Sequence, residues 1–327
     1  MENEQSAEDI IRGKSALVFC GGGVLGVGHI GALAEWEKMG GYRNLTHVCG
    51  SSVGSIVAAA VAANASVEFM KSTLFNLDFK QFEDNSTGFL RDLYRLVKKW
   101  GWNKGDAIKE WSENLMCELT GKHHITMKQL YEKSHTHLTI TYWSYRYRKT
   151  KYIDHLTQPD MTVAEAIRMS SSIPIYYQAV WRKSLDANQR EMLDAILDGG
   201  VLDNFPIRTL HSQGVPPEKI LGFKLCGTEE LNEYEAEKNG EEIDYGLPDG
   251  IVHALVVLVS CMRELAMKVH VQKSDWKLTV KINVFGYKST DFSMSDQDKE
   301  KIYESGRQAI RDYVKEVRER LENGEEW

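Results

Sequence analysis

The sequence has 327 residues, of which 42% are hydrophobic and 27% are charged, and its formal net charge is −7 at pH 7. This balance is typical of a globular protein and allows one large α/β domain or two small ones. The acidic excess argues against a nucleic-acid-binding protein, which needs a dominant basic face.

The first part of the chain, residues 1–14, is polar and acidic and lacks the basic start and apolar centre of a secretory signal. We expect it to form a frayed or weakly helical tail. The longest apolar stretch, Ile251–Met262, is too short to span a bilayer. The five cysteines form no zinc-like cluster and are interpreted as reduced thiols. These features predict a cytoplasmic protein that is soluble or peripheral to membranes.

Two strand-loop-helix units follow. An apolar run at Ser15–Phe19 predicts a buried strand, and Gly26–Lys38 continues with apolar residues at helical spacing. Thr46–Cys49 and the Ala-rich Val53–Ala63 repeat this order. Alternation of strands and helices favours a parallel sheet covered by helices.

The next region, residues 67–131, becomes helical and amphipathic, most clearly at Arg91–Trp102 and Asp106–Leu119. We interpret it as an insertion or a cap. Two strand-like runs, His137–Tyr145 and Thr150–Asp154, flank a basic turn and predict a hairpin.

The remaining chain completes an α/β pattern without a recognisable linker, so residues 15–327 are predicted to form one domain with a mostly parallel central sheet. Its expected elements are a helix at Val163–Met169, a strand at Ile220–Leu225, a mobile polar loop at Gly227–Asp249, a helix at Gly250–Val269, a strand at Lys277–Val284 and a closing helix at Ser295–Leu321.

A serine framed by glycines stands between the second strand and its helix, in the pattern Gly50-x-Ser52-x-Gly54. This is the pattern of a nucleophile elbow, in which small neighbours let strand and helix pass closely and the serine hydroxyl stands above the sheet. The pentad also occurs in ordinary tight turns. Its place between a strand and a helix favours the nucleophile.

The glycine run Gly21, Gly22 and Gly23 follows the first strand. Consecutive backbone N–H groups without side chains suit an oxyanion hole. The same run also fits a dinucleotide fingerprint, which requires an acidic residue at the end of the second strand. Here that strand ends in Cys49 and Gly50, so we expect no nucleotide cofactor. No cluster with metal-ligand spacing is apparent, so we also expect no metal.

A serine nucleophile needs a base. Asp198 ends the apolar run Ala195–Leu197 and precedes Gly199 and Gly200, which leave its carboxylate accessible to another side chain. An Asp-Gly turn is the alternative interpretation. Because each motif follows a strand-like run, a parallel sheet would bring the serine, the glycine loop and Asp198 to one carboxyl edge.

Ten histidines offer no clear alternative base. His29 lies beside the glycine loop, and His211 and His253 come late enough for a Ser-Asp-His order, but none stands in a turn typical of a catalytic loop.

Four blocks in this order, Cys20–Leu33, Gly50–Ser55, Ser170–Pro174 and Asp198–Pro206, resemble the patatin-like phospholipase family. The resemblance extends over about Ser15 to Arg311. It implies a three-layer α/β/α fold, Ser52 as nucleophile, Asp198 as general base, the backbone of Gly21, Gly22 and Gly23 as oxyanion hole, and Gly50, Gly54, Gly199 and Gly200 as supporting positions. Many members carry a basic residue where this chain has Leu25, which affects the expected head-group preference.

The resemblance implies hydrolysis of acyl esters in a phospholipid or another acyl lipid. A lysophospholipase or thioesterase of the same mechanism, and a catalytically silent lipid-binding scaffold, remain alternatives. Basic and aromatic residues alternate in Arg91–Lys104 and Tyr145–Lys151, which suits peripheral contact with anionic head groups or, equally, an ordinary solvated helix face.

Overall fold

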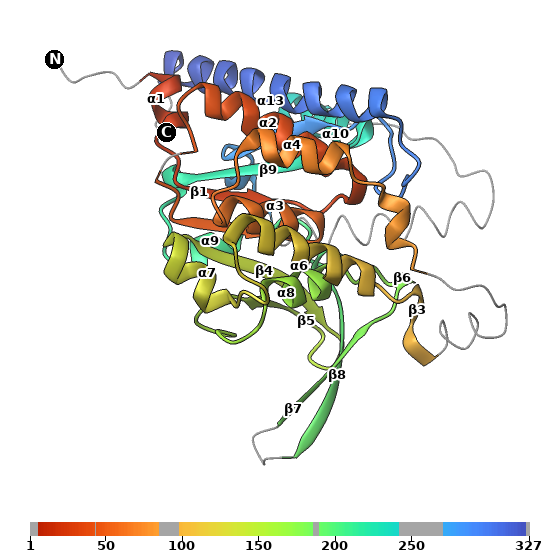
Figure 1. Ribbon diagram of the computed structural model, residues 1–327. Coiled ribbons are helices and arrows are strands. Elements are labelled where there is room, and N and C mark those ends of the chain that lie inside the picture. Colours follow the sequence, from red (N-terminus) through yellow and green to blue (C-terminus); the bar gives the residue numbers. More distant parts are fainter. Residues whose placement is uncertain (1–5, 43, 85–97, 186–189, 242–270, 325–327) are drawn as a thin grey trace.

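The computed structural model describes residues 6–42, 44–84, 98–185, 190–241 and 271–324 (Figure 1). Its strands are β1 (Ala16–Phe19), β2 (His47–Gly50), β3 (Gly101–Asn103), β4 (His137–Ser144), β5 (Lys149–Ile153), β6 (Ile175–Tyr177), β7 (Val180–Leu185), β8 (Glu191–Asp198), β9 (Ile220–Cys226) and β10 (Thr279–Asn283). Its helices are α1 (Ala7–Arg12), α2 (Val27–Lys38), α3 (Val53–Ala62), α4 (Val67–Phe75), α6 (Asp106–Thr120), α7 (Met127–Ser134), α8 (Val163–Ser170), α9 (Ile207–Ser212), α10 (Thr228–Asn239), α12 (Lys273–Trp276) and α13 (Asp296–Glu322).

The central sheet has the strand order β10-β9-β1-β2-β4-β8-β7, with β5 paired to β4. The neighbours from β10 to β4 are parallel. The predicted hairpin is confirmed, because β4 and β5 are antiparallel. A second, small sheet pairs β3 with β6 in parallel.

Helices cover both faces of the central sheet, because successive residues of its strands point to opposite sides. Leu17 and Phe19 of β1 face the large core beneath α2, α3 and α13. Ala16 and Val18 face a second core that includes Phe205 from the segment before α9. The expected three-layer α/β/α fold with a mostly parallel sheet is therefore confirmed (Figure 1).

Strand β8 departs from the parallel arrangement expected for Ala195–Leu197, since it runs antiparallel to β4 and pairs Asp198 with Tyr142. On its other side β8 forms an antiparallel hairpin with β7. Strand β8 thus enters from beyond the carboxyl end of β4 and ends there. Gly50 pairs with Ile140 in the parallel neighbour, so Ser52 and Asp198 reach the same edge from opposite directions.

Two further expectations differ from the structure. The segment expected as a frayed or weakly helical tail does contain a helix, α1, but it is packed against the protein: Ile10 and Ile11 are buried in the main core, and Glu8 pairs with Arg318 of α13. The polar loop expected from Gly227 onward begins with helix α10 instead. The predicted helix at Gly250–Val269 and most of the one at Arg91–Trp102 lie outside the described residues. The cap assignment for residues 67–131 stays a prediction.

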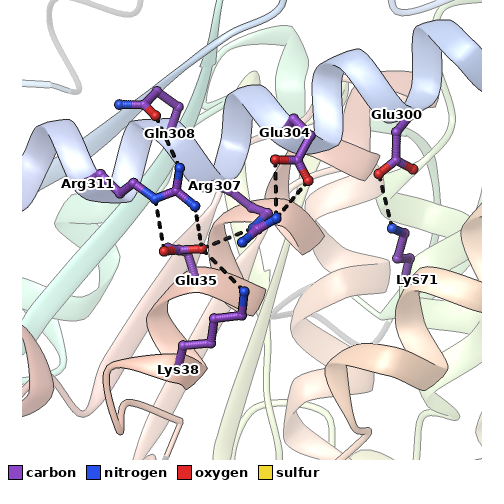
Figure 2. Close-up of polar contacts among 8 residues, drawn as sticks. All are labelled: Glu35, Lys38, Lys71, Glu300, Glu304, Arg307, Gln308 and Arg311. Atoms are coloured by element: carbon purple, nitrogen blue, oxygen red, sulfur yellow. Dashed lines mark hydrogen bonds and ion pairs between the residues drawn. The ribbon is translucent and has the colours of Figure 1, made fainter.

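The closing helix α13 crosses α2 at close range. Glu35 of α2 is almost buried and accepts hydrogen bonds from Arg307 Nε at 3.0 Å and from Arg311 Nε at 2.9 Å (Figure 2). Hydrogen bonds, that from Arg311 above all, hold the pKa of Glu35 below its usual range. Charge-assisted pairs of this kind fix the register of the two helices.

Gly306 of α13 lies at a point of very close approach to α2, because a Cβ atom there would lie 2.0 Å from the carbonyl oxygen of Gly28. We expect Gly306→Ala to lower the free energy of unfolding by about 1–3 kcal/mol, although alanine is the better helix former by about 1 kcal/mol. Urea denaturation measures this. Gln308→Ala, at an exposed position on the same helix, is the control and should change stability little. An unchanged midpoint for Gly306→Ala would contradict the tight crossing.

Candidate active site

Ser52 occupies a strained turn between β2 and α3. Its backbone dihedrals are φ 52° and ψ −126°, an uncommon conformation for a residue other than glycine. The framing glycines are required by close approach, since a Cβ at Gly50 would lie 2.1 Å from Gly54 O, and one at Gly54 would lie 2.3 Å from Phe19 O. The geometry is that of a nucleophile elbow, with the serine at the amino end of α3.

Asp198 faces this turn from the end of β8. It is 4% exposed, and Ser52 is 7% exposed. Asp198 Oδ1 accepts a hydrogen bond from Gly200 N at 2.7 Å, whereas Asp198 Oδ2 has no hydrogen-bond partner among the residues that the structure describes. Burial raises the pKa of Asp198 to about 7, and the Ser52 hydroxyl acts in the opposite direction by favouring the carboxylate.

The Ser52 hydroxyl is thus close enough to influence Asp198, but the pair does not meet the geometry of a full hydrogen bond. Looseness of this kind is common in catalytic pairs before substrate binds. A carboxyl group whose pKa lies near neutrality is a far better base than an unperturbed aspartate, whose pKa is about 3.9.

The segment Ser170–Ser172 joins the two groups. Ser170 Oγ accepts a hydrogen bond from Ser52 N at 2.9 Å, and the backbone carbonyl of Ser172 accepts one from Asp198 N at 2.9 Å. The buried guanidinium of Arg168 donates to Ser172 Oγ at 2.6 Å. A single turn at the end of α8 therefore positions both Ser52 and Asp198.

The glycine loop lies next to Ser52, because a Cβ at Gly21 would lie 3.1 Å from Ser52 Cβ. Gly21 N already donates to the carbonyl of Asn204 at 3.0 Å, and Asn204 Nδ2 donates to Gly21 O at 3.2 Å. For the N–H groups of Gly22 and Gly23 the described part of the chain provides no acceptor. The N–H groups of Gly22 and Gly23 are therefore available to donate hydrogen bonds to a bound oxygen atom, whereas that of Gly21 is not.

Of the histidines considered as bases, His29 and His211 do not join this site. His29 is buried, contacts the Cys20 carbonyl at 3.0 Å through Nε2, and has its pKa lowered to about 4 by burial. His211 pairs with Asp275 at 3.3 Å. His253 lies outside the described residues. In the described ranges no cluster of three or more His, Cys, Asp or Glu side chains is arranged to hold a metal ion.

Comparison with protein families identifies the family of this chain. The family model of the patatin-like phospholipases matches residues 17–211, which is more than half of the chain. The chain belongs to the patatin-like phospholipase family. Ser52, Asp198 and the glycine loop at Gly21–Gly23 all lie within the matched residues.

Two relatives are similar to this chain over different lengths. It is 26% identical to the Bacillus subtilis protein YqhO, over 91% of this chain and 97% of that protein. It is also 26% identical to Triacylglycerol lipase 5 of Saccharomyces cerevisiae, over 50% of this chain but only 22% of the yeast protein.

Among solved structures, VipD from Legionella pneumophila matches with a TM-score of 0.58 and 17% identity, covering 93% of this chain and 67% of VipD. At this identity the likeness supports the fold.

Some residues of the site had no assigned role from the sequence. Ser170 and Ser172 belong to a serine run before Ile173-Pro174 that marks the family resemblance, but no local pattern indicates which hydroxyl meets the elbow. Asn204 lies in the Asp198–Pro206 block of the resemblance but had no assigned role, because its contact with Gly21 joins distant parts of the chain.

Proposed function

We propose that this protein is a lipid acyl hydrolase of the phospholipase A type, acting through a Ser52–Asp198 dyad. The observation that carries the proposal is the buried Asp198, with a pKa of about 7, beside a serine in a strained elbow. Membership in the patatin-like phospholipase family supports hydrolysis of lipid esters as the general activity.

In the first half of the reaction, Ser52 Oγ attacks the ester carbonyl and its proton passes to the Asp198 carboxylate. The carbonyl oxygen becomes an oxyanion, which the N–H groups of Gly22 and Gly23 and the amino end of α3 stabilise. The C–O bond to the leaving alcohol then breaks. Asp198 returns the proton to that alcohol, and the acyl group stays on Ser52.

In the second half, water attacks the acyl-Ser52 carbonyl while Asp198 takes one of its protons. The new tetrahedral intermediate uses the same N–H donors. Collapse expels Ser52 Oγ, which regains a proton from Asp198, and releases the fatty acid. The proton balance closes within the dyad, so this proposal needs no further titrating group.

A small apolar cavity of about 20 Å³ lies between helices beside the candidate site. Helices α2, α3, α4 and α6 line it, and its α3 residues Ile56, Val57 and Ala60 lie about one to two helical turns from Ser52. Trp111 of α6 closes another side. Its lining suits an apolar group, but its volume is far below that of a lipid-sized pocket, so an acyl chain requires these helices to move apart.

The yeast relative is named a triacylglycerol lipase, so a neutral lipid is a second candidate substrate for the same chemistry. A lysophospholipid or a thioester would use the same steps. We further propose a cytoplasmic location with peripheral membrane contact, supported by four described cysteines without disulfides. No helix in the described ranges is long and apolar enough to cross a membrane.

Labelling with an alkyl fluorophosphonate tests the proposal. We expect the label on Ser52, located by peptide mass mapping, with fluoride as the leaving group. The labelling rate should rise with pH around a midpoint near 7, since only the deprotonated Asp198 can accept the serine proton.

Heat-denatured protein is the control and should not react. A folded protein that binds lipid but remains unlabelled would favour the silent scaffold. Mass spectrometry of the products from phospholipid, triacylglycerol, lysophospholipid and acyl-thioester substrates then separates the remaining substrate classes.

A further inference from the structure

Strands β7 and β8 form an arm that projects from the body of the protein (Figure 1). Only the last residues of β8, Ile196 to Asp198, pair with β4, so the earlier part of β8 extends beyond the sheet. At about 3.3 Å per residue, the stretch from Asp198 to Glu191 reaches about 20 Å past the site. The described arm residues are Val180–Leu185 and Glu191–Asp198.

One face of this arm is aromatic and apolar near the body of the protein and carries the Lys183–Glu191 ion pair toward its tip. Trp181 and Leu193 share this face, because opposite residues of paired strands point the same way. The Trp100 ring lies 5.2 Å from that of Trp181 and 4.9 Å from that of Tyr145. Trp181 is 37% exposed, Tyr145 48% and Leu193 47%, so three large side chains remain in contact with water.

The turn between β4 and β5 adds positive charge beside this face. This turn and the start of β5 carry basic residues without an acidic one, namely Arg146 and Arg148 in the turn and Lys149 and Lys151 in β5. Arg148 and Lys149 are exposed, whereas Arg146 is held against β8 by a hydrogen bond from Nε to the Leu193 carbonyl. The whole chain has a net charge of −7, so this local excess of positive charge is opposite in sign to the rest of the protein.

The arm and the site share one edge of the sheet. Asp198 lies at the end of β8, and the β4–β5 turn follows the carboxyl end of β4. The arm and the turn therefore both project beyond the edge where Ser52 lies. A planar surface that meets the arm would therefore face the Ser52 edge. Aromatic rings and basic side chains together are typical of protein segments at a lipid-water interface.

We propose that the aromatic face of the β7–β8 arm and the basic β4–β5 turn form a docking surface for an anionic lipid bilayer. The inference rests on the proposed lipid hydrolase function, whose substrate such a surface supplies. Trp181, Tyr145 and Leu193 enter the interface, while Arg148 and Lys149 contact anionic head groups. The two predicted basic-aromatic segments meet here, because Trp100 from the first contacts Tyr145 from the second.

Co-sedimentation with vesicles tests the docking surface in a Ser52→Ala background, where hydrolysis cannot alter the bilayer. We expect binding to phosphatidylcholine vesicles containing phosphatidylserine, and weaker binding to phosphatidylcholine alone or at high salt. Arg148→Gln with Lys149→Gln should weaken binding by about 25-fold, at about five-fold per charge. Trp181→Ser with Leu193→Ser should weaken it by about tenfold.

Matched controls lie at the other end of the sheet. Lys122→Gln with Lys128→Gln removes two exposed charges near α7, and Leu156→Ser removes a leucine that is 72% exposed. Both should bind vesicles as the parent does. If the variant with Trp181→Ser and Leu193→Ser fails to fold, the variant with Arg148→Gln and Lys149→Gln decides the result, because both residues are exposed where the turn meets β5.

With Ser52 restored, the arm variants should lose hydrolysis of vesicle lipid but keep hydrolysis of a short soluble ester. Equal binding by arm variants and controls would overturn the docking surface. So would arm-dependent self-association of the chain without vesicle binding, detected by gel filtration. Absence of ester hydrolysis in the parent would instead contradict the proposed function, while the binding result would stand separately.

Discussion

Replacing Ser52 by alanine should abolish ester hydrolysis, with a loss of at least about 10⁴-fold in kcat/KM. The proposed mechanism forms its covalent intermediate on Ser52 Oγ, and the described site offers no second hydroxyl in a strained elbow. The fold should remain, because Gly50 and Gly54 keep the close crossing of β2 and α3. A soluble ester assay and a thermal melt of the same preparation measure both effects.

Ser55→Ala provides the matched control for Ser52→Ala. It removes the same hydroxyl one helical turn along α3, where Ser55 Oγ donates to the Ser52 carbonyl at 2.5 Å. We expect this variant to keep most of the activity. Undiminished hydrolysis by purified Ser52→Ala would remove Ser52 as the nucleophile, and a parallel loss in both variants would indicate a structural effect of the turn.

The Asp198→Asn variant should lose about 10²-fold or more in kcat, because the amide keeps the shape of the carboxyl but cannot accept the serine proton. In the parent, kcat/KM should rise with pH around a midpoint near 7, since the deprotonated carboxylate is the active form. The pH profile and kcat of the two proteins measure this role of the base.

The same substitution should affect stability in the opposite direction. Between its ordinary pKa of 3.8 and about 7, the folded protein holds a proton on Asp198 that the unfolded chain has released. Stability therefore falls as the pH rises through this window, and Asp198→Asn should be about 1–3 kcal/mol more stable than the parent at pH 8. Denaturant titrations at pH 5 and pH 8 test the sign.

Asp194→Asn is the control for position 198, since Asp194 is also a buried carboxylate on β8 but accepts hydrogen bonds from Ser144 and Arg146. It should lose stability and keep substantial activity. A histidine variant, such as His29→Gln, that is as inactive as Asp198→Asn would replace the dyad with a triad.

The local motifs could be predicted from sequence because their physical requirements are local. A close strand-helix crossing excludes side chains at positions 50 and 54, and the sequence shows this directly because both positions are glycine. The helix from Ser295 was equally clear, since Ser295 caps it and its apolar residues recur at helical spacing. The helix after Gly227 was missed because its polar sequence lacks that periodicity.

The sequence by itself determined the α/β class, the family resemblance and the candidate pair Ser52 and Asp198, because strand patterns and glycine turns are encoded in short segments. Only the tertiary structure decided that β8 reaches the site antiparallel, that Asn204 occupies Gly21 N, and that burial raises the Asp198 pKa. These properties depend on contacts between segments far apart in the chain. Strand direction, hydrogen-bond partners and desolvation are set by those neighbours, and no short stretch of sequence contains them.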